Sequence, residues 1–311
     1  MSPPPPPMPA SASALCIGVN QLDPRAYGGF KGFLYGAVRD AEAMVTIATA
    51  QGMSVASLTD EYATTSHVLD HIKQVADSAV AGDLFMLTFS GHGAQLPDRQ
   101  GEEADRLDET WCLYDRELVD DEIYDALAAF KPGVRVLVVL DSCHSGSVVA
   151  DFAPAVDPST LGPTFGSGVR SRQLPREVEL QNRERNGSTR QGTSLQINHS
   201  NVLSNLQASV LVLSACADDE EAYETDGYGD FTSALVDVWN GGDFTGGYEE
   251  FMSRIAERLT RQTPGRSWGN AEDPAFLASS VFTTGAGALT DGLPADARKM
   301  SIQTTSESSV R

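Results

Sequence analysis

The sequence has few cysteines, no long apolar run and no stretch at its N-terminus that resembles a signal peptide. None of its four cysteines (Cys16, Cys112, Cys143, Cys216) belongs to a CxxC pair, so neither a disulfide framework nor a zinc ribbon is indicated. No apolar stretch approaches the roughly 18 residues that a membrane-spanning helix needs. The opening MSPPPPPMPASASA lacks the basic start and apolar core of a signal peptide. We therefore expect a cytoplasmic protein.

Basic residues are also scarce. The chain has 22 Lys and Arg against 43 Asp and Glu, which gives a net charge of −21. Such a charge repels phosphates at long range, and this argues against nucleic acids and anionic membranes as partners. It favours cationic ligands, either metal ions or basic protein segments.

Short apolar runs alternate with stretches of helical periodicity. The runs are apolar almost throughout, which is typical of strands buried on both faces. The predicted strands are 14–19, 53–58, 84–89, 134–140 and 209–215, and the predicted helices are 36–52, 65–82, 120–130, 231–240 and 247–262. This alternation predicts an α/β fold in which helices cover both faces of a mainly parallel sheet.

The segment 151–205 breaks the alternation. It is rich in Pro, Gly, Ser, Asn and Arg without an apolar period, so we expect a long, flexible surface connection inside one domain spanning 14–284. Residues 1–13 and 285–311 are expected to be disordered tails. The segment also holds six arginines on an otherwise acidic protein, and these require an explanation: Arg170, Arg172, Arg176, Arg183, Arg185 and Arg190.

Two predicted strands end in chemically active residues. The stretch LFMLTFSGHG places His92 between two glycines, and VLVVLDSCHSG places Cys143 just after a buried strand. In open parallel sheets, ligands bind at the carboxyl ends of the strands. The two residues are separated by about 50 positions, the spacing of the His and Cys in caspases.

The motifs FSGHG and LDSCHSG together resemble those of the caspase-like cysteine peptidases, specifically metacaspases and their bacterial relatives. The resemblance covers about 14–150 and resumes more weakly at VLSACADDEEAYE and GDFTSAL. It implies a caspase-like three-layer α/β/α sandwich, with a large-subunit-like part (14–150), the Arg-rich linker (151–205) and a small-subunit-like part (206–284). It also implies a monomer.

A thiol nucleophile needs thiolate character and a group that protonates the leaving amine, and an imidazole supplies both. We assign these roles to Cys143 and His92. His144 is a rival imidazole, although a sequence neighbour of the nucleophile usually points elsewhere. The resemblance implies that the amides of Gly93 and Cys143 form the oxyanion hole.

Acidic residues near the nucleophile predict the substrate. The family's pocket acids match Asp40, in GAVRDA, and Asp141, while Ser90 and Asp218 are further candidates for its wall. Carboxylates repel an incoming aspartate and pair with a guanidinium. We therefore expect cleavage of proteins and peptides after Arg or Lys. Ala37 departs from the family, where a cysteine often lies near the pocket.

An acidic cluster near 108–121 suggests calcium, which takes six to eight oxygen ligands. By resemblance to calcium-activated metacaspases, the ligands would be Asp108, Asp120, Asp121 and Asp151, although strict alignment puts Ala150 at the last position. Alternatively, Asp120 and Asp121 cap the helix that follows them.

An enzyme that cuts after Arg could cleave its own Arg-rich linker, whereas a purely solubilising linker is the alternative. Two other functions stay open: a catalytically idle caspase-like scaffold or calcium-binding interaction module, and a peptidase of the same fold that cuts after Asp or Asn. No arginine is evident near the predicted pocket, which argues against Asp. A zinc hydrolase is disfavoured because the His and Cys residues lack paired ligand spacing.

Overall fold

A computed structural model describes residues 10–97, 107–143, 168–189, 206–217, 220–269 and 272–284. Its centre is a six-stranded sheet in the order β12-β9-β7-β3-β1-β2. Five strands run parallel, and only β12 is antiparallel to its neighbour. The strands are β1 (Ala12–Gly18), β2 (Ser54–Thr59), β3 (Leu84–Ser90), β7 (Arg135–Asp141), β9 (Ser209–Ser214) and β12 (Gly265–Trp268).

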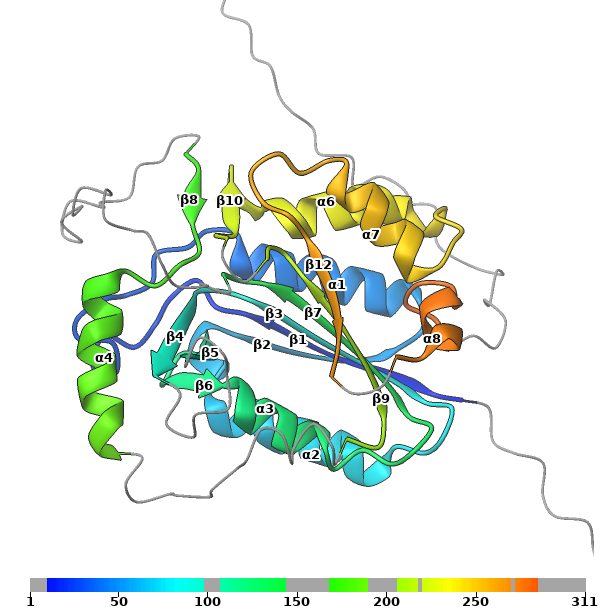
Figure 1. Cartoon of the computed structure of the whole chain (residues 1–311), viewed down its shortest axis with the longest axis horizontal. Helices are drawn as coiled ribbons and strands as arrows, with labels where there is room; N and C mark the ends of the chain where they lie inside the picture. The colour runs from blue at the N-terminus through cyan, green and yellow to red at the C-terminus, as the bar shows by residue number, and fades with distance from the viewer. Residues whose placement is uncertain are drawn as a thin grey trace, which may run out of the picture.

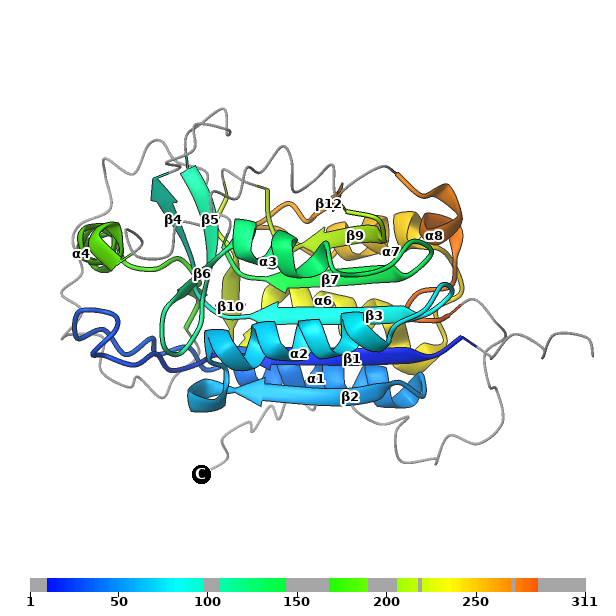
Figure 2. The same cartoon turned by 90° about the horizontal axis from the view of Figure 1, so that it is seen from below.

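Helices cover both faces of this sheet (Figures 1 and 2). The helices α1 (Ala37–Ala50), α6 (Asp230–Trp239) and α7 (Tyr248–Ala256) lie on one face, and α2 (Thr65–Ser78) and α3 (Asp120–Leu127) lie on the other. The short α8 (Pro274–Ala278) packs against α7. The predicted three-layer α/β/α sandwich is therefore confirmed. No helix in the described ranges is both long and apolar enough to cross a membrane.

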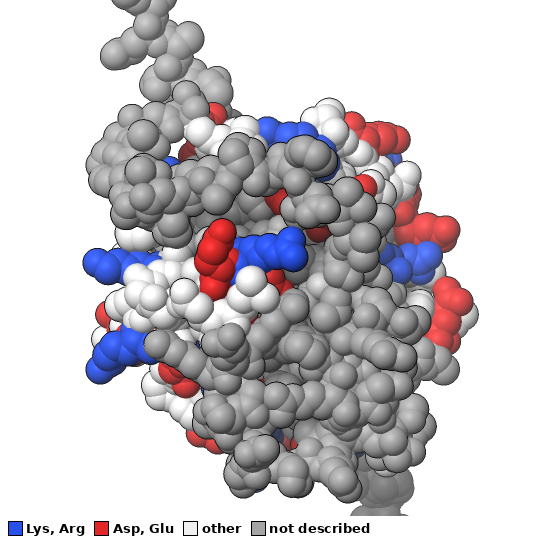
Figure 3. Space-filling model, turned by 60° about the vertical axis from the view of Figure 1, so that its left-hand side comes forward, with Lys and Arg blue, Asp and Glu red and all other residues white. Residues whose placement is uncertain are grey.

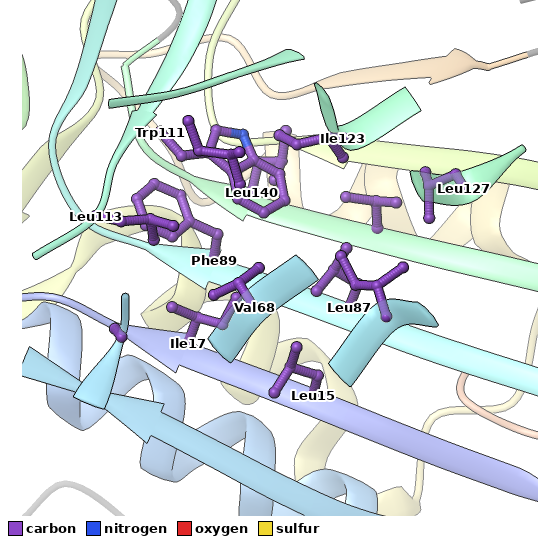
Figure 4. Close-up of a cluster of buried hydrophobic side chains, with 14 of the residues drawn as sticks. Leu15, Ile17, Val68, Leu87, Phe89, Trp111, Leu113, Ile123, Leu127 and Leu140 are labelled. Atoms are coloured by element: carbon purple, nitrogen blue, oxygen red, sulfur yellow. The ribbon is translucent and has the colours of Figure 1, made fainter. Parts of the chain in front are cut away.

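The alternation of side chains along the strands divides the core in two. Leu15 and Ile17 of β1 pack on the α2 and α3 side, while Ala14 and Cys16 pack on the α1 and α6 side. Figure 4 shows the first cluster, in which Phe89 lies against Trp111 with ring centroids 4.9 Å apart. Strands buried on both faces give the sheet a rigid base for the loops at their carboxyl ends.

Smaller elements gather at that end of the sheet. One three-stranded sheet consists of β4 (Gly93–Pro97), β5 (Leu107–Cys112) and β6 (Glu117–Val119), and another consists of β8 (Arg170–Ser171), β10 (Tyr223–Thr225) and β11 (Tyr228–Gly229). The helix α4 (Arg176–Thr189) follows β8. The 310 turns η1 (Asp60–Tyr62) and η3 (Asn240–Gly242) complete the described elements.

Two expectations need correction. The strand predicted at 53–58 is the edge strand β2, and none of its residues is fully buried, because no strand covers its outer side. The segment 168–189, expected to belong to a flexible connection, instead forms β8 and α4, with Leu174 and Val178 buried in the core. Two apolar side chains four positions apart are too few to establish a helical period in the sequence.

Candidate active site

The predicted catalytic residues follow two neighbouring strands. Ser90 of β3 pairs with Asp141 of β7, so the two strands end side by side. His92 and Cys143 lie two residues beyond these ends. The parallel sheet thus brings together residues about 50 positions apart in the chain, as the sequence predicted.

Gly93 lies against the backbone of Cys143. A Cβ atom at position 93 would come 1.8 Å from the carbonyl oxygen of Cys143, far inside any allowed contact. The amide of Gly93 donates a hydrogen bond of 3.0 Å to the carbonyl oxygen of Arg172. Glycine is therefore required at this position, and its amide points at a peptide carbonyl, as an oxyanion-hole donor should.

The imidazole of His92 is buried between two carbonyl oxygens. Nδ1 lies 3.1 Å from the oxygen of Arg172, and Nε2 lies 3.0 Å from the oxygen of Gly32. Burial lowers the pKa of His92. A neutral ring donates from one nitrogen only. The neutral ring therefore donates to one of the two carbonyl oxygens, that of Gly32 or that of Arg172, and either bond orients the imidazole. The contact between His92 and Gly32 was not predicted, because every residue has a backbone carbonyl and the sequence does not show which one faces the imidazole.

The thiol of Cys143 is almost inaccessible, at 1% exposure. Its Sγ accepts a hydrogen bond from the amide of Ala222 at 3.1 Å and lies 3.4 Å from the oxygen of Ala222. Burial raises the pKa of this thiol well above its usual range. The described state therefore holds Cys143 as an inactive thiol, because nucleophilic attack needs the thiolate.

Asp40, Ser90 and Asp141, the residues predicted to bind the substrate, are buried and lie together around one arginine side chain, and we call this cluster the acidic pocket. The Ser90 hydroxyl donates to Asp40 Oδ2 at 2.7 Å. The amide and hydroxyl of Thr232 donate to Asp141 Oδ2 at 2.9 and 2.7 Å. The amide of Gly229 donates to Asp40 Oδ1 at 3.0 Å. These donors fix both carboxylates in place, and Thr232 and Gly229 belong to the GDFTSAL motif.

Arg172 fills this pocket, and its side chain is 0% exposed. One terminal nitrogen lies 2.5 Å from Asp40 Oδ2, and the other lies 2.9 Å from Asp141 Oδ1 and donates to the Ser90 hydroxyl at 2.7 Å. The expectation that no arginine lies near the pocket is therefore wrong. The arginine comes from the linker and is one of its six arginines, and the sequence pattern does not indicate where the linker lies in the fold.

A third acid, Glu224, was not predicted. Its buried carboxylate accepts hydrogen bonds from the amides of Tyr35 and Gly36 at 3.0 and 2.9 Å, and lies 3.8 Å from the Arg172 guanidinium. Glu224 lies in β10 and is the last residue of the motif VLSACADDEEAYE. The sequence ADDEEAYE contains several acids, and nothing in it distinguishes Glu224 as the buried one.

The backbone around Arg172 runs through the site in extended form. Arg170 and Ser171 pair antiparallel with Glu224 and Tyr223, and Gln173 forms a parallel bridge with Gly93. The amide of Leu174 then donates to the oxygen of Gly93 at 3.0 Å. The linker thus lies across the predicted catalytic residues in the way a strand-like peptide ligand binds a sheet edge.

The charge of Asp141 depends on its surroundings. Burial, together with the negative charge of Asp40, raises its pKa to about 6, although Arg172 and Thr232 act in the opposite direction. Arg172 itself has a raised pKa because three acids surround it, and this outweighs its burial. The guanidinium is therefore charged, and it holds Asp141 in its ionised form near neutral pH.

Several predicted residues cannot be placed. Asp218, Asp151 and the rival imidazole His144 lie outside the described residues, as does the side chain of Asp108. Asp120 and Asp121 begin α3, where Asp120 Oδ1 accepts from the amide of Asp121 at 2.9 Å. Within the described ranges, no group of three His, Cys, Asp or Glu side chains could hold a metal ion. These residues alone do not make up the predicted calcium site.

The chain is similar in sequence to curated metacaspases. The chain is 30% identical over 158 residues to Metacaspase-4 of Arabidopsis thaliana, covering 47% of this chain and 36% of the relative. It is 34% identical over 152 residues to Metacaspase-1A of Aspergillus fumigatus, covering 44% of this chain and 35% of the relative. The chain thus spans about a third of the length of these curated relatives.

A structural relative covers more of the chain. A crystal structure of a protein from Geobacter sulfurreducens matches with a TM-score of 0.74 and 37% identity, over 88% of this chain and 98% of the relative. The sequence pattern of the caspase domain matches residues 12–283, which run from the first strand of the central sheet almost to the last described residue of the chain. The chain therefore belongs to the caspase-domain family of cysteine peptidases.

Proposed function

We propose that this chain is a cysteine endopeptidase that cleaves after Arg or Lys, and that its first substrate is its own bond between Arg172 and Gln173. The observation that carries the proposal is the position of Arg172. Its side chain fills the acidic pocket while its carbonyl oxygen accepts a hydrogen bond from Gly93. A residue bound at both points has the arrangement of the residue that precedes a scissile bond.

The reaction would proceed through an acyl-enzyme. Once His92 has removed the thiol proton, Cys143 Sγ attacks the carbonyl carbon of Arg172, and the amide of Gly93 stabilises the resulting oxyanion. The amide of Cys143 is the predicted second donor. His92 then delivers the proton to the amine of Gln173, which leaves, and water hydrolyses the thioester between Cys143 and Arg172.

The pocket geometry favours Arg over Lys. Arg172 uses both terminal nitrogens to reach Asp40, Ser90 and Asp141 at the same time. A planar guanidinium offers such a fork of donors, whereas an ammonium group is a single point charge. Cleavage after Asp or Asn is disfavoured, because these side chains would bring acceptors or no charge to a pocket lined with carboxylates.

The test is self-cleavage of the purified full chain, followed by gel electrophoresis and mass spectrometry of the fragment ends. We expect a cut after Arg172 in wild type, none in Cys143→Ala or His92→Ala, and none at this bond in Arg172→Ala. Arg176→Ala is the matched control, because Arg176 belongs to the same segment but is exposed. An intact Arg172–Gln173 bond in a chain that cleaves Arg peptides would remove the self-processing part of the proposal.

Calcium activation is a separate part of the proposal, resting on the density of acids around Asp108, Asp120, Asp121 and Asp151. The described residues do not by themselves fit a complete calcium site, so no step is derived through the ion. Cleavage is to be measured in millimolar calcium and in chelator. Equal rates would discard the calcium switch and retain the peptidase.

The alternative is a catalytically idle scaffold or calcium-binding module in which Arg172 is a permanent structural ion pair. Absence of cleavage of every Arg and Lys peptide, by wild type and by Arg172→Ala, would favour it. The predicted monomeric state and cytoplasmic location remain predictions, to be tested by sedimentation and by localisation in cells.

A further inference from the structure

The linker carries a second arginine into a site of its own. The guanidinium carbon of Arg170 lies 4.7 Å from the centre of the Tyr35 ring, a distance at which a cation is attracted by the face of an aromatic ring. Nε of Arg170 lies 4.0 Å from Oε1 of Glu224. Arg170 thus has an aromatic platform and an acid, in addition to its strand pairing with β10.

Glu224 is held ready to receive a cation. Its side chain is 1% exposed, and the amides of Tyr35 and Gly36 fix both carboxylate oxygens. In the β8–β10 pair, Glu224 lies directly opposite Arg170. Directly opposed residues in antiparallel strands bring their side chains to the same face of the sheet. The carboxylate therefore lies between two guanidinium groups, 4.0 Å from that of Arg170 and 3.8 Å from that of Arg172.

The platform is open to ligands that arrive from outside. Tyr35 is 39% exposed, unlike the buried acids of the pocket that holds Arg172. Figure 3 shows the side of the molecule on which the strands end, where positive and negative side chains lie beside one another in the described part. A peptide that pairs with β10 as β8 does would place every second side chain on the same face.

We propose that Tyr35 and Glu224 form a second cation-binding subsite, which selects Arg or Lys two residues before the residue whose carbonyl is attacked. This inference rests on the proposed function. The preferred substrates are then peptides with the pattern basic, any residue, Arg, which in this chain is Arg170, Ser171 and Arg172. The dipeptide spacing follows from the extended backbone, because the middle side chain faces the opposite way.

The first test uses three fluorogenic peptides that differ at one position: Val-Arg-Ser-Arg, Val-Ala-Ser-Arg and Val-Glu-Ser-Arg, each with the dye after the last residue. The enzyme is the full chain carrying both Arg170→Ala and Arg172→Ala, so that its linker supplies no arginine to compete for the acidic pocket or for the Tyr35–Glu224 subsite. We expect kcat/KM to be about tenfold lower for Val-Ala-Ser-Arg than for Val-Arg-Ser-Arg, and lower still for Val-Glu-Ser-Arg. The tenfold figure follows from the usual strength of a partly exposed cation–aromatic contact beside an acid. Equal rates for the Arg and Ala peptides would refute the subsite while retaining cleavage after Arg. No cleavage of any peptide would instead refute the proposed function.

The second test separates the subsite from general damage to the pocket. Tyr35→Ala should remove the preference for Arg over Ala, whereas Tyr35→Phe keeps the ring face and should retain it. Glu224→Gln, which keeps an acceptor for the backbone amides, should reduce the preference while the peptides are still cut. A preference that survives Tyr35→Ala and Glu224→Gln would overturn the assignment of these two residues. In wild-type background, Arg170→Ala should slow self-cleavage after Arg172 about tenfold, and Arg176→Ala should not.

Discussion

The backbone amide of Gly93 lies 3.0 Å from the carbonyl oxygen of Arg172, while the other end of Arg172 is locked between two carboxylates. One residue thus occupies the two places that a peptidase of this kind must offer its substrate. Since Cys143 is also buried and its pKa is raised in this arrangement, the described state is that of a site occupied by its own linker.

Gly93→Ala should abolish cleavage. The added methyl would meet the carbonyl oxygen of Cys143 at 1.8 Å, so the β4 backbone must move and carry its amide away from the substrate. Loss of one oxyanion donor alone costs about a hundredfold to a thousandfold in kcat. Peptide hydrolysis and circular dichroism are to be measured together. The control is Gly246→Ala, where the atoms nearest to the added methyl belong to the side chains of Glu250 and Phe244 and not to the backbone. Full activity in a folded Gly93→Ala variant would contradict the assigned role.

Arg172→Lys should still be cut after residue 172, but more slowly than wild type. A lysine cannot bond Asp40, Ser90 and Asp141 together, and loss of such charge-assisted bonds costs about tenfold or more in rate. Fragment yield against time on a gel gives the ratio. Arg172→Glu should block cleavage at this bond, since like charges would meet in the pocket; a cut after Glu there would contradict acidic selection.

Cleavage after Arg should weaken in acid because Asp141 becomes protonated. Its pKa is about 6 with Arg172 in the pocket, where burial raises the pKa and the guanidinium lowers it. Because kcat reports the complex with bound substrate, its acid limb for an Arg peptide should have a midpoint of about 6. For folding, the raised pKa means that the folded state binds this proton more tightly than the unfolded state. The contribution of Asp141 to stability is therefore present in acid and lost as pH rises from its usual pKa through about 6.

The variant Thr232→Val tests whether Asp141 is the group whose protonation reduces activity in acid. The Thr232 hydroxyl donates to Asp141 at 2.7 Å and holds the pKa of that carboxyl down, so its removal should move the acid midpoint to higher pH. We also expect kcat/KM for Arg peptides to fall about fivefold to tenfold, the usual loss for a hydrogen bond to a charged group. An unchanged midpoint would assign the acid limb to another group, such as His92.

Cys143 should resist alkylation in the occupied chain and react once the linker leaves. Burial raises its pKa, so little thiolate is present near neutral pH. Site-resolved mass spectrometry after brief iodoacetamide treatment should show at least about tenfold faster labelling of Cys143 in Arg172→Ala than in an unprocessed His92→Ala chain. Cys16 in β1 is the internal control, because it is buried in the sheet away from the linker and burial raises its pKa to about 11. Equal labelling of Cys143 would show that the linker does not shield it.

The sequence was most informative where strands are continuous apolar runs. β1, β3, β7 and β9 were predicted within one or two residues, since strands buried on both faces contain almost no polar residues. His92, Ser90 and Asp141 followed from their places at or just beyond strand ends. Asp40 required the family resemblance, because one acid in an amphipathic helix is otherwise taken for a solvated residue.

The parts that were missed depend on contacts between distant segments. Arg172 reaches Asp40 across 132 positions, and Glu224 reaches Gly36 across 188. β8 has only two residues, so it carries no periodic signal, and its strand pairing arises from the groups it meets on β10. Composition suggested a solvated linker, whereas specific ion pairs bury part of it.

The two sides of the Arg172–Gln173 bond are anchored very differently. Upstream, the chain is held by two paired residues and the two arginines, whereas downstream Leu174 is 1% exposed, Val178 is buried and Asn182 donates to the buried Glu117 at 2.9 Å. After a cut, the new amine at Gln173 would stay beside the thiol as a tethered competitor, at the high local concentration that a short tether creates. A peptide that carries only a dye after its arginine would then need the upstream segment alone to leave, whereas a folded protein substrate would also need α4 to dissociate from the site.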